Sequence, residues 1–352
     1  MRDKGFFGRL LIAAAVITAC LFGLRPETAL AAGLVVETPL RGFAGLGLGD
    51  AGVITFVGLG MVINLENLAA IFKTFLTTFN KAFSGVKPMW EQVAMKVPST
   101  TAENVYAWLG AFPRMREWIG DRQYKNLRTH DFSIKNKEFE ATIEVPKKNI
   151  EDDSVGVFTP VVAELGRAAA THPDELVFAL LAAGLTTLCY DGQYFFDTDH
   201  PVGSGVVSNN LGGAGTAWYL MDTTRALMPL IFQRRKEPEF VQMTDPNSSE
   251  HVFKTGKHLY GVDDRKNVGF GLWQLAITSK QTLDAAGYAA ARAAMMEFKD
   301  DEGRPLGITP SLLVVPPSLE GEARELLLSE RTATGATNKW RNSAEMLVVP
   351  WL

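Results

Sequence analysis

The stretch DFSIKNKEFEATIEV, residues 131–145, carries the clearest secondary-structure signal of the chain. Apolar residues alternate with polar ones on both sides of Asn136-Lys137. Because successive side chains of a strand point to opposite faces, this pattern predicts a β-hairpin that turns at Asn136-Lys137. One face of the hairpin is apolar and the other is densely charged. The charged residues are Lys135, Lys137, Glu138, Glu140 and Glu144. A two-stranded ribbon is marginally stable alone, so it needs a partner surface in its own domain or in a neighbouring subunit.

A helix is predicted on the N-terminal side of this stretch. Residues 65–83, LENLAAIFKTFLTTFNKAF, place apolar side chains three and four positions apart. Asn64 is a suitable N-cap, and the helix should end near Ser84-Gly85.

The chain turns helical again after the charged stretch. Thr159 and Thr171 are both suitable caps, and Pro173 lies within the helical pattern. Since proline is tolerated in a first turn but kinks a helix interior, the region is either two short helices or one long helix kinked at Pro173.

Strands and helices alternate without a regular βαβ order in the remainder of the chain. Residues 251–260, 269–279, 312–316 and 347–352 read as strands, and residues 282–298 and 318–330 as helices. These elements predict an α+β fold.

The bulk composition limits the possible functions. The 352 residues are 47% hydrophobic, which is enough for one large domain or two moderate ones. The net charge of −4 and the absence of a Lys/Arg block argue against direct, salt-sensitive DNA binding. Two cysteines, Cys20 and Cys189, do not make a disulfide framework.

The first sixty residues differ in character from the rest. Residues 1–32 combine a basic start, an apolar stretch and small residues at a possible cleavage site, and they resemble an export signal in which Cys20 also suits a lipoprotein box. Residues 41–60 are rich in glycine and suit a flexible join. Either the protein is exported, or Met61 is the true start; we favour Met61.

The most enzyme-like cluster is Phe196-Asp197-Thr198-Asp199-His200-Pro201. Asp197, Asp199 and His200 could bind a divalent metal or form an acid–base pair. The alternative is a polar turn in which the aspartates accept backbone N–H bonds, and Cys189 is more simply a packed residue than a nucleophile. We expect no catalytic, cofactor or metal site.

From Met61 onward, the sequence resembles the Mu-like major head subunit family. The likeness rests on a colinear series of stretches, which is more specific than any single short motif. They are WLGAFPRMREWIG (108–120), KEFEATIEVPKKNIEDD (137–153), PDELVFALL (173–181), CYDGQYFFDTDHP (189–201), WYLMDTTRALMPLIFQRRKEPEFV (218–241), GFGLWQLA (269–276) and LVVP (313–316).

The resemblance implies the tailed-phage major capsid fold of the Hong Kong 97 type. Within residues 61–352 it implies four parts, after a leader and join of residues 1–60. They are an N-terminal arm (61–120), an E-loop hairpin (121–150), a peripheral domain with a spine helix (151–190) and a mainly axial domain (191–352).

The resemblance also implies a structural protein and not an enzyme. Its copies would form hexamers and pentamers of an icosahedral shell around double-stranded DNA, with scaffold, protease and portal proteins as partners and no membrane or cofactor. Assembly would take place in the host bacterial cytoplasm. The hairpin would lay its apolar side on a neighbouring subunit and use its five charged residues as inter-subunit contacts. The competing hypotheses are an exported envelope lipoprotein and a metal-dependent hydrolase.

Overall fold

The computed structural model describes residues 65–109, 132–152 and 155–352. The export-like leader, the glycine-rich join and the predicted cap Asn64 lie outside these ranges. The described residues divide into a smaller unit (65–75, 144–152, 155–159 and 243–259) and a larger unit that holds the rest. No helix within the described ranges is long and apolar enough to span a membrane.

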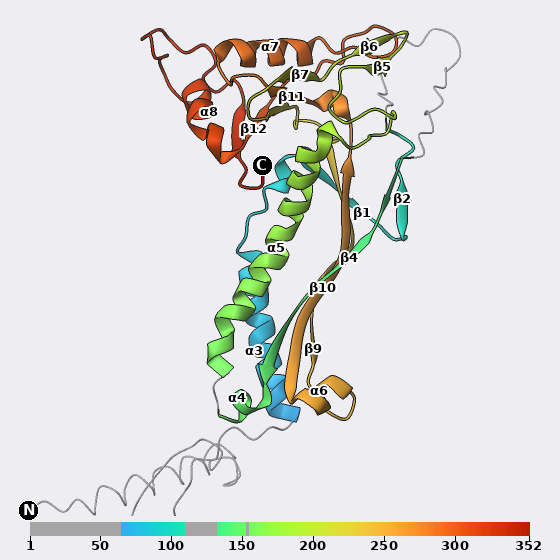
Figure 1. The fold of residues 1–352 in the computed structure, drawn as a ribbon, viewed down its shortest axis with the longest axis vertical. Helices are drawn as coiled ribbons and strands as arrows, with labels where there is room; N and C mark the ends of the chain where they lie inside the picture. Colours follow the sequence, from blue (N-terminus) through green and yellow to red (C-terminus); the bar gives the residue numbers. More distant parts are fainter. Residues whose placement is uncertain (1–64, 110–131, 153–154) are drawn as a thin grey trace, which may run out of the picture. The chain divides into compact units, whose positions relative to one another are not determined.

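The first sheet of the structure has four strands in the order β1-β9-β10-β4 (Figure 1). They are β1 (Ala94–Pro98), β9 (Leu230–Met243), β10 (Lys257–Phe270) and β4 (Lys137–Pro146). β1 runs parallel to β9, with Ala94 opposite Leu230. β4 is an edge strand of this sheet, so only one of its sides is paired within it.

The second sheet has five strands in the order β13-β12-β8-β11-β7 and lies in the larger unit. They are β7 (Asn210–Gly213), β8 (Trp218–Met221), β11 (Ala276–Lys280), β12 (Leu312–Val315) and β13 (Glu345–Val348). Every residue of β8 and β12 is buried. Such uniformly apolar strands are typical of a sheet that is covered on both faces. The C-terminal half of the chain also forms α7 (Ala285–Met296) and α8 (Glu320–Leu327), as the sequence predicted.

Two long helices carry the remaining periodic stretches. α3 (Leu65–Ser84) confirms the predicted amphipathic helix, and α5 (Thr159–Ala182) is one continuous helix with Pro173 inside it. Thr171 does not cap a second helix, since its hydroxyl donates to the carbonyl of Arg167 at 3.2 Å within α5. The alternative with one long helix is therefore confirmed.

α3 and α5 approach each other closely at a glycine. A Cβ atom added to Gly166 would lie 2.6 Å from the carbonyl oxygen of Phe79. No side chain fits at that distance, so the position requires glycine.

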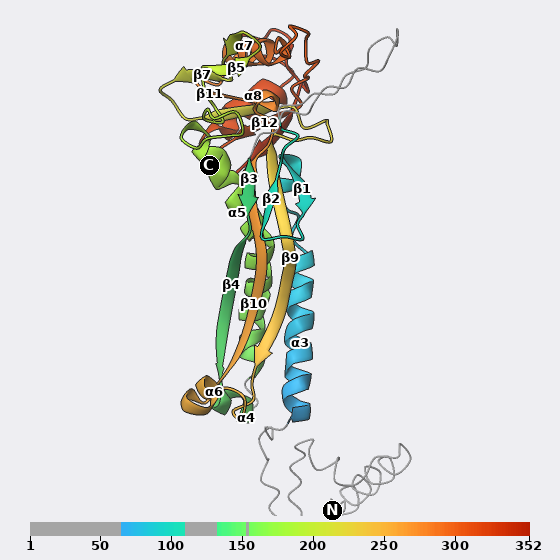
Figure 2. The ribbon, with the colours of Figure 1, turned by 90° about the vertical axis from the view of Figure 1, so that its right-hand side faces the viewer.

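The predicted hairpin at Asn136-Lys137 is wrong. β3 (Ser133–Lys135) pairs antiparallel with β2 (Glu103–Val105), whereas β4 pairs with β10 (Figure 2). Asn136, between β3 and β4, is buried, and its Nδ2 donates to the Ser99 hydroxyl and the Thr101 carbonyl at 2.9 Å each. These bonds hold Asn136 where the chain passes from the two-stranded sheet of β2 and β3 into the four-stranded sheet. A turn residue exposed to solvent would not form them.

The predicted strand over residues 251–260 is only partly correct. Its first half is a helix, α6 (Glu250–Thr255), and β10 begins at Lys257. The Ser249 side chain accepts from the Val252 N–H at the start of α6, and Gly256 ends the helix with a φ of 63°. A capping serine and a left-handed glycine are standard helix boundaries, and they override the local strand-like pattern.

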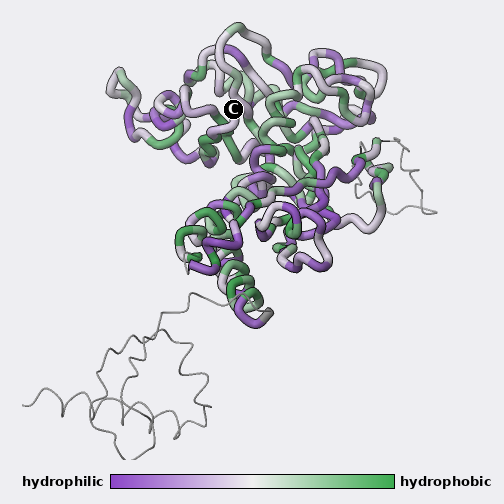
Figure 3. The backbone as a smooth tube through the Cα atoms, turned by 60° about the horizontal axis from the view of Figure 1, so that its bottom comes forward, coloured by the Kyte–Doolittle hydropathy of each residue, from purple (hydrophilic) through white to green (hydrophobic). Residues whose placement is uncertain are grey.

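Besides 3-10 helices at Trp90–Gln92, Val155–Phe158, Ala183–Leu185, Trp273–Leu275 and Pro317–Leu319, three further short elements are present in the described chain. They are α4 (Lys147–Glu151) and the antiparallel pair β5 (His200–Val202) and β6 (Gly205–Val207). Short hydrophobic stretches alternate with hydrophilic ones along the chain (Figure 3), as expected where most elements bury one face.

Candidate functional site

The two faces of β4 are as the sequence predicted. Exposed residues alternate along the strand with partly buried ones, and Val145 is fully buried. The Phe139 ring lies 4.5 Å from the His172 ring of α5, centroid to centroid, and the Lys266 Nζ lies 5.6 Å from the centre of the Phe139 ring. The apolar face therefore packs within its own chain at Phe139. Cover of this face by a neighbouring subunit stays a prediction.

Four of the five charged residues predicted as contacts lie on the larger unit. Glu138 is 3.3 Å from Arg265, and the Thr142 hydroxyl donates to Glu140 at 2.8 Å. Lys135 and Lys137 are exposed and form no ion pair with any residue that the structure describes. The two lysines are thus the predicted contacts whose side chains have no acidic partner among the described residues.

The fifth residue, Glu144, lies in the smaller unit and is neutralised there. The Lys257 ammonium donates to its carboxylate, and His251 Nε2 lies 3.3 Å from it. The hydrogen bond from Lys257, opposed by desolvation and helped by the positive charges of Lys257 and His251, lowers the pKa of Glu144 below its ordinary value. Glu144 is consequently less available as an inter-subunit contact than the lysines.

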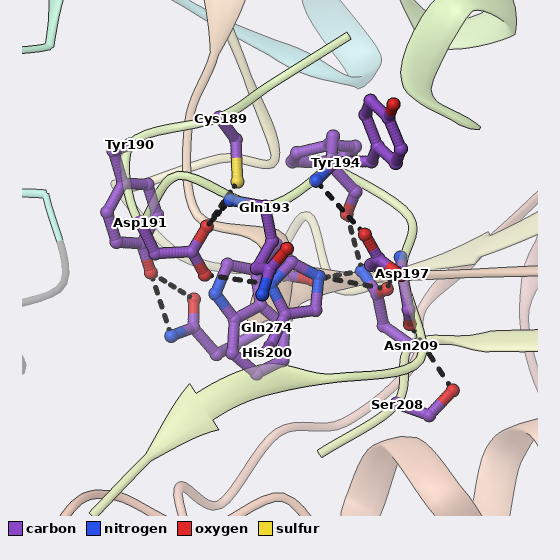
Figure 4. Close-up of polar contacts among 12 residues, drawn as sticks. Cys189, Tyr190, Asp191, Gln193, Tyr194, Asp197, His200, Ser208, Asn209 and Gln274 are labelled. Carbon is purple, nitrogen blue, oxygen red and sulfur yellow. Dashed lines mark hydrogen bonds and ion pairs between the residues drawn. The ribbon is translucent and has the colours of Figure 1, made fainter. Parts of the chain in front are cut away.

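A second polar site lies in the loop that leads into β5. Its centre is Asp191, whose Oδ1 is 3.0 Å from the Cys189 Sγ and whose Oδ2 is 2.7 Å from His200 Nδ1 (Figure 4). Burial by itself would raise the pKa of Asp191, but the hydrogen bonds from His200 and Cys189 outweigh it and lower that pKa. The site is a compact buried network.

Asn209 fixes the other side of His200. Its Nδ2 donates to the carbonyls of Phe195 and Ala276 at 2.8 and 3.3 Å. Its Oδ1 therefore faces His200, with the Nε2 at 3.2 Å. The imidazole also stacks on Trp273, with the ring centroids 4.0 Å apart and the planes 9° apart. The ring is held on both edges and on one face.

The trio Asp197, Asp199 and His200 does not come together as a site. Asp197 accepts backbone N–H bonds from Tyr194 at 3.2 Å and from Thr198 at 2.7 Å, and Asp199 is exposed. The polar-turn interpretation of Asp197 is therefore confirmed. In the described part of the chain, the group that could hold a metal is Cys189, Asp191 and His200.

Sequence reasoning missed Asp191. The signal was present in the Cys-Tyr-Asp spacing of residues 189–191, but only folding shows that this turn meets His200. Cys189 is buried, and its burial together with the neighbouring Asp191 carboxylate holds its pKa well above the ordinary value of a thiol. It packs, as expected, and is not an activated nucleophile.

The sequence matches the profile of the Mu-like prophage major head subunit gpT over residues 68–352. The major head subunit of the Mu-like prophage FluMu of Haemophilus influenzae is 44% identical over 276 residues, which are 75% of this chain and 89% of that protein. The major capsid protein of Escherichia phage Mu is 38% identical over 301 residues, which are 80% of this chain and 98% of that protein.

Solved structures show the same relationship. The chain of the bacteriophage JBD30 procapsid is 46% identical, with a TM-score of 0.75, and the match covers 82% of this chain and all of that one. The JBD30 capsid chain is 35% identical, with a TM-score of 0.67 and coverages of 82% and 99%. The α+β fold is that of a tailed-phage capsid protein, as the resemblance implied, and the chain belongs to the Mu-like prophage major head subunit family.

Proposed function

We propose that this major head subunit assembles with its own copies, as hexamers and pentamers, into an icosahedral shell around double-stranded DNA. The observation that carries the proposal is the match to the JBD30 procapsid chain, which this chain covers completely at 46% identity. A shell gains its stability from many large, partly polar interfaces and needs no active site. We therefore propose a structural role without catalysis.

The four-part division of residues 61–352 remains a proposal that the described elements support in part. All five strands of the second sheet fall between residues 210 and 348, within the proposed axial domain. β9 instead pairs with β1, in the proposed N-terminal arm, and β10 pairs with β4, in the proposed E-loop. α5 has the length and position in the chain expected of the spine helix.

The proposed E-loop includes a strand of the first sheet. We had placed it at residues 121–150, but β4 is committed to the first sheet. β2 and β3 form an antiparallel pair at the two ends of residues 106–132. The part of the proposed E-loop that β4 forms is therefore not a free hairpin, and residues 110–131 lie outside the described ranges.

Lys135 and Lys137 are the proposed inter-subunit contacts with the best support. They are exposed and lack an acidic partner in the described chain, whereas Glu138, Glu140 and Glu144 already have partners. An individual surface ion pair contributes about 0–1 kcal/mol. Repetition over a closed shell multiplies that contribution.

The further partners proposed for this subunit are scaffold, protease and portal proteins, with assembly in the host cytoplasm. The net charge of −4 supports enclosure of DNA without specific binding, since the sequence holds no contiguous Lys/Arg block of the kind that neutralises phosphates.

Electron microscopy of the purified full chain tests the proposal. We expect rings, shells or tubes at high protein concentration, accompanied by a rise in scattering mass. A second sample begins at Met61 and lacks the export-like leader. If Met61 is the true start, this sample should assemble without the leader. Strictly monomeric protein at every concentration and ionic strength, for both samples, would contradict the shell proposal.

A further inference from the structure

Cys189, Asp191 and His200 place three different metal-binding groups in one small buried volume. One ligand atom from each residue lies within 4.8 Å of the other two. Cys189 is 5% exposed, and the side chains of Asp191 and His200 are 7% and 0% exposed. A thiol, a carboxylate and an imidazole that converge away from solvent are rarer than an exposed acidic cluster, and each of them binds zinc in proteins.

Two direct contacts join the three side chains of this group. An ionised carboxylate only accepts hydrogen bonds, so the 3.0 Å contact of Asp191 Oδ1 requires a proton on Cys189 Sγ. The 2.7 Å contact of Oδ2 likewise requires a proton on His200 Nδ1. A divalent cation among the three ligand atoms would displace the thiol proton, with the imidazole proton on Nε2 and Nδ1 free to coordinate. Metal binding to thiols releases protons in this way.

The surroundings of His200 are those of an oriented metal ligand. Asn209 Oδ1 lies 3.2 Å from His200 Nε2 and accepts from it in the tautomer that carries the proton on Nε2, and the carbonyl partners of Asn209 Nδ2 fix the orientation of that amide. A protonated Nε2 held by an acceptor leaves Nδ1 as the coordinating atom, which is the usual outer-shell arrangement of a histidine ligand. The stacking of the imidazole on Trp273 fixes the plane of the His200 ring.

We propose that Cys189, Asp191 and His200 bind a divalent cation of the zinc type, with water in the fourth position. The thiolate and imidazole select zinc or cobalt over magnesium and calcium, which prefer oxygen ligands. The cation would tie residues 189–191 to the start of β5, and its role would be structural. The inference departs from our metal-free expectation, because the sequence did not reveal that Asp191 meets His200.

Cobalt titration of the full-length protein, after dialysis against a chelator, tests the site. We expect one Co²⁺ per chain, a thiolate-to-cobalt charge-transfer absorption band, and loss of that band when Zn²⁺ is added in competition. Cys189→Ser should abolish the band. The matched control is Cys20→Ser, which removes the other cysteine of the chain and should leave the band intact.

Asp191→Asn provides a second test that keeps the cysteine. It should weaken Co²⁺ binding by about tenfold or more and remove the rise in melting temperature that Zn²⁺ gives the wild-type protein. Near-UV circular dichroism checks that each variant is folded. Cobalt binding without a charge-transfer band, a band that survives in Cys189→Ser, or no binding by the folded wild type would overturn the proposal.

Discussion

Gln233 Nε2 donates a hydrogen bond of 2.8 Å to Asn136 Oδ1, although the two residues are 97 positions apart in the chain. The same Nε2 donates to the Ile134 carbonyl at 3.0 Å, and the Gln233 Oε1 accepts from the Tyr106 hydroxyl at 2.7 Å. Gln233 and Asn136 are both buried. A buried amide that satisfies both its donor and its acceptor groups fixes the chain path around it, and here it fixes the path between β3 and β4.

Asn136→Ala should lower the free energy of unfolding by about 1–3 kcal/mol, because the hydrogen bonds of a buried amide are lost together. Urea unfolding measures the change. The control is Asn247→Ala, which removes an exposed amide bonded only to Asp245 and should change stability by about 0.5 kcal/mol or less. Equal effects of the two substitutions would mean that Asn136 does not hold the crossing between the sheets.

Gly166→Ala should destabilise the protein by about 1–3 kcal/mol, since the added Cβ would lie 2.6 Å from the Phe79 carbonyl oxygen and force α3 and α5 apart. The same measurement applies to Gly321→Ala in α8, where a Cβ meets no atom within 4 Å. That control should stabilise the helix by about 1 kcal/mol. A stabilising effect at both positions would contradict the close approach of the two helices.

Reversal of charge at Lys135 and Lys137 together, to Glu, should block shell formation and leave the melting temperature of the monomer nearly unchanged. The reason is that neither lysine has an ionic partner within the described chain. Glu138 is left intact because it pairs with Arg265. Electron microscopy and differential scanning calorimetry give the two readouts.

The matched control for these lysines is Lys148→Glu with Lys299→Glu, which makes the same change of charge at exposed positions outside the β3–β4 region. Shells should still form. If the Lys135 and Lys137 variant unfolds, the lysines belong to the fold itself, and if it assembles normally they are not contacts.

Glu144 should contribute to stability at neutral pH and lose that contribution in acid. The Lys257 partner lowers the folded-state pKa of Glu144 below 4.5. The stabilisation is therefore present above the ordinary pKa of 4.5 and is lost as pH falls through the lower folded-state value. Melting temperatures measured from pH 6 downward should fall less steeply for Glu144→Gln than for the wild type.

The control for this pH dependence is Glu140→Gln, which removes a carboxylate of the same strand whose partner is the Thr142 hydroxyl. Its acid profile should follow that of the wild type more closely. Identical profiles for Glu144→Gln and the wild type would show that the ion pair with Lys257 does not stabilise the fold.

Local patterns determined α3 and the two faces of β4. Three- and four-residue spacing identified α3, and alternation assigned Phe139 and Val145 to one face of β4. These properties depend on residues that are near one another in sequence, and the colinear stretches from residue 108 onward likewise identified the family.

Only the tertiary structure decided which elements and side chains meet. Alternation sets the two faces of a strand but says nothing about the strand along its edge, so the pairing of β4 with β10 and not with β3 depended on residues about a hundred positions away. In the same way His200 meets Asp191 and not Asp199, because Asn209 and Trp273 orient its ring. Faces follow from the period of the backbone, whereas partners follow from the long-range packing that satisfies buried polar groups.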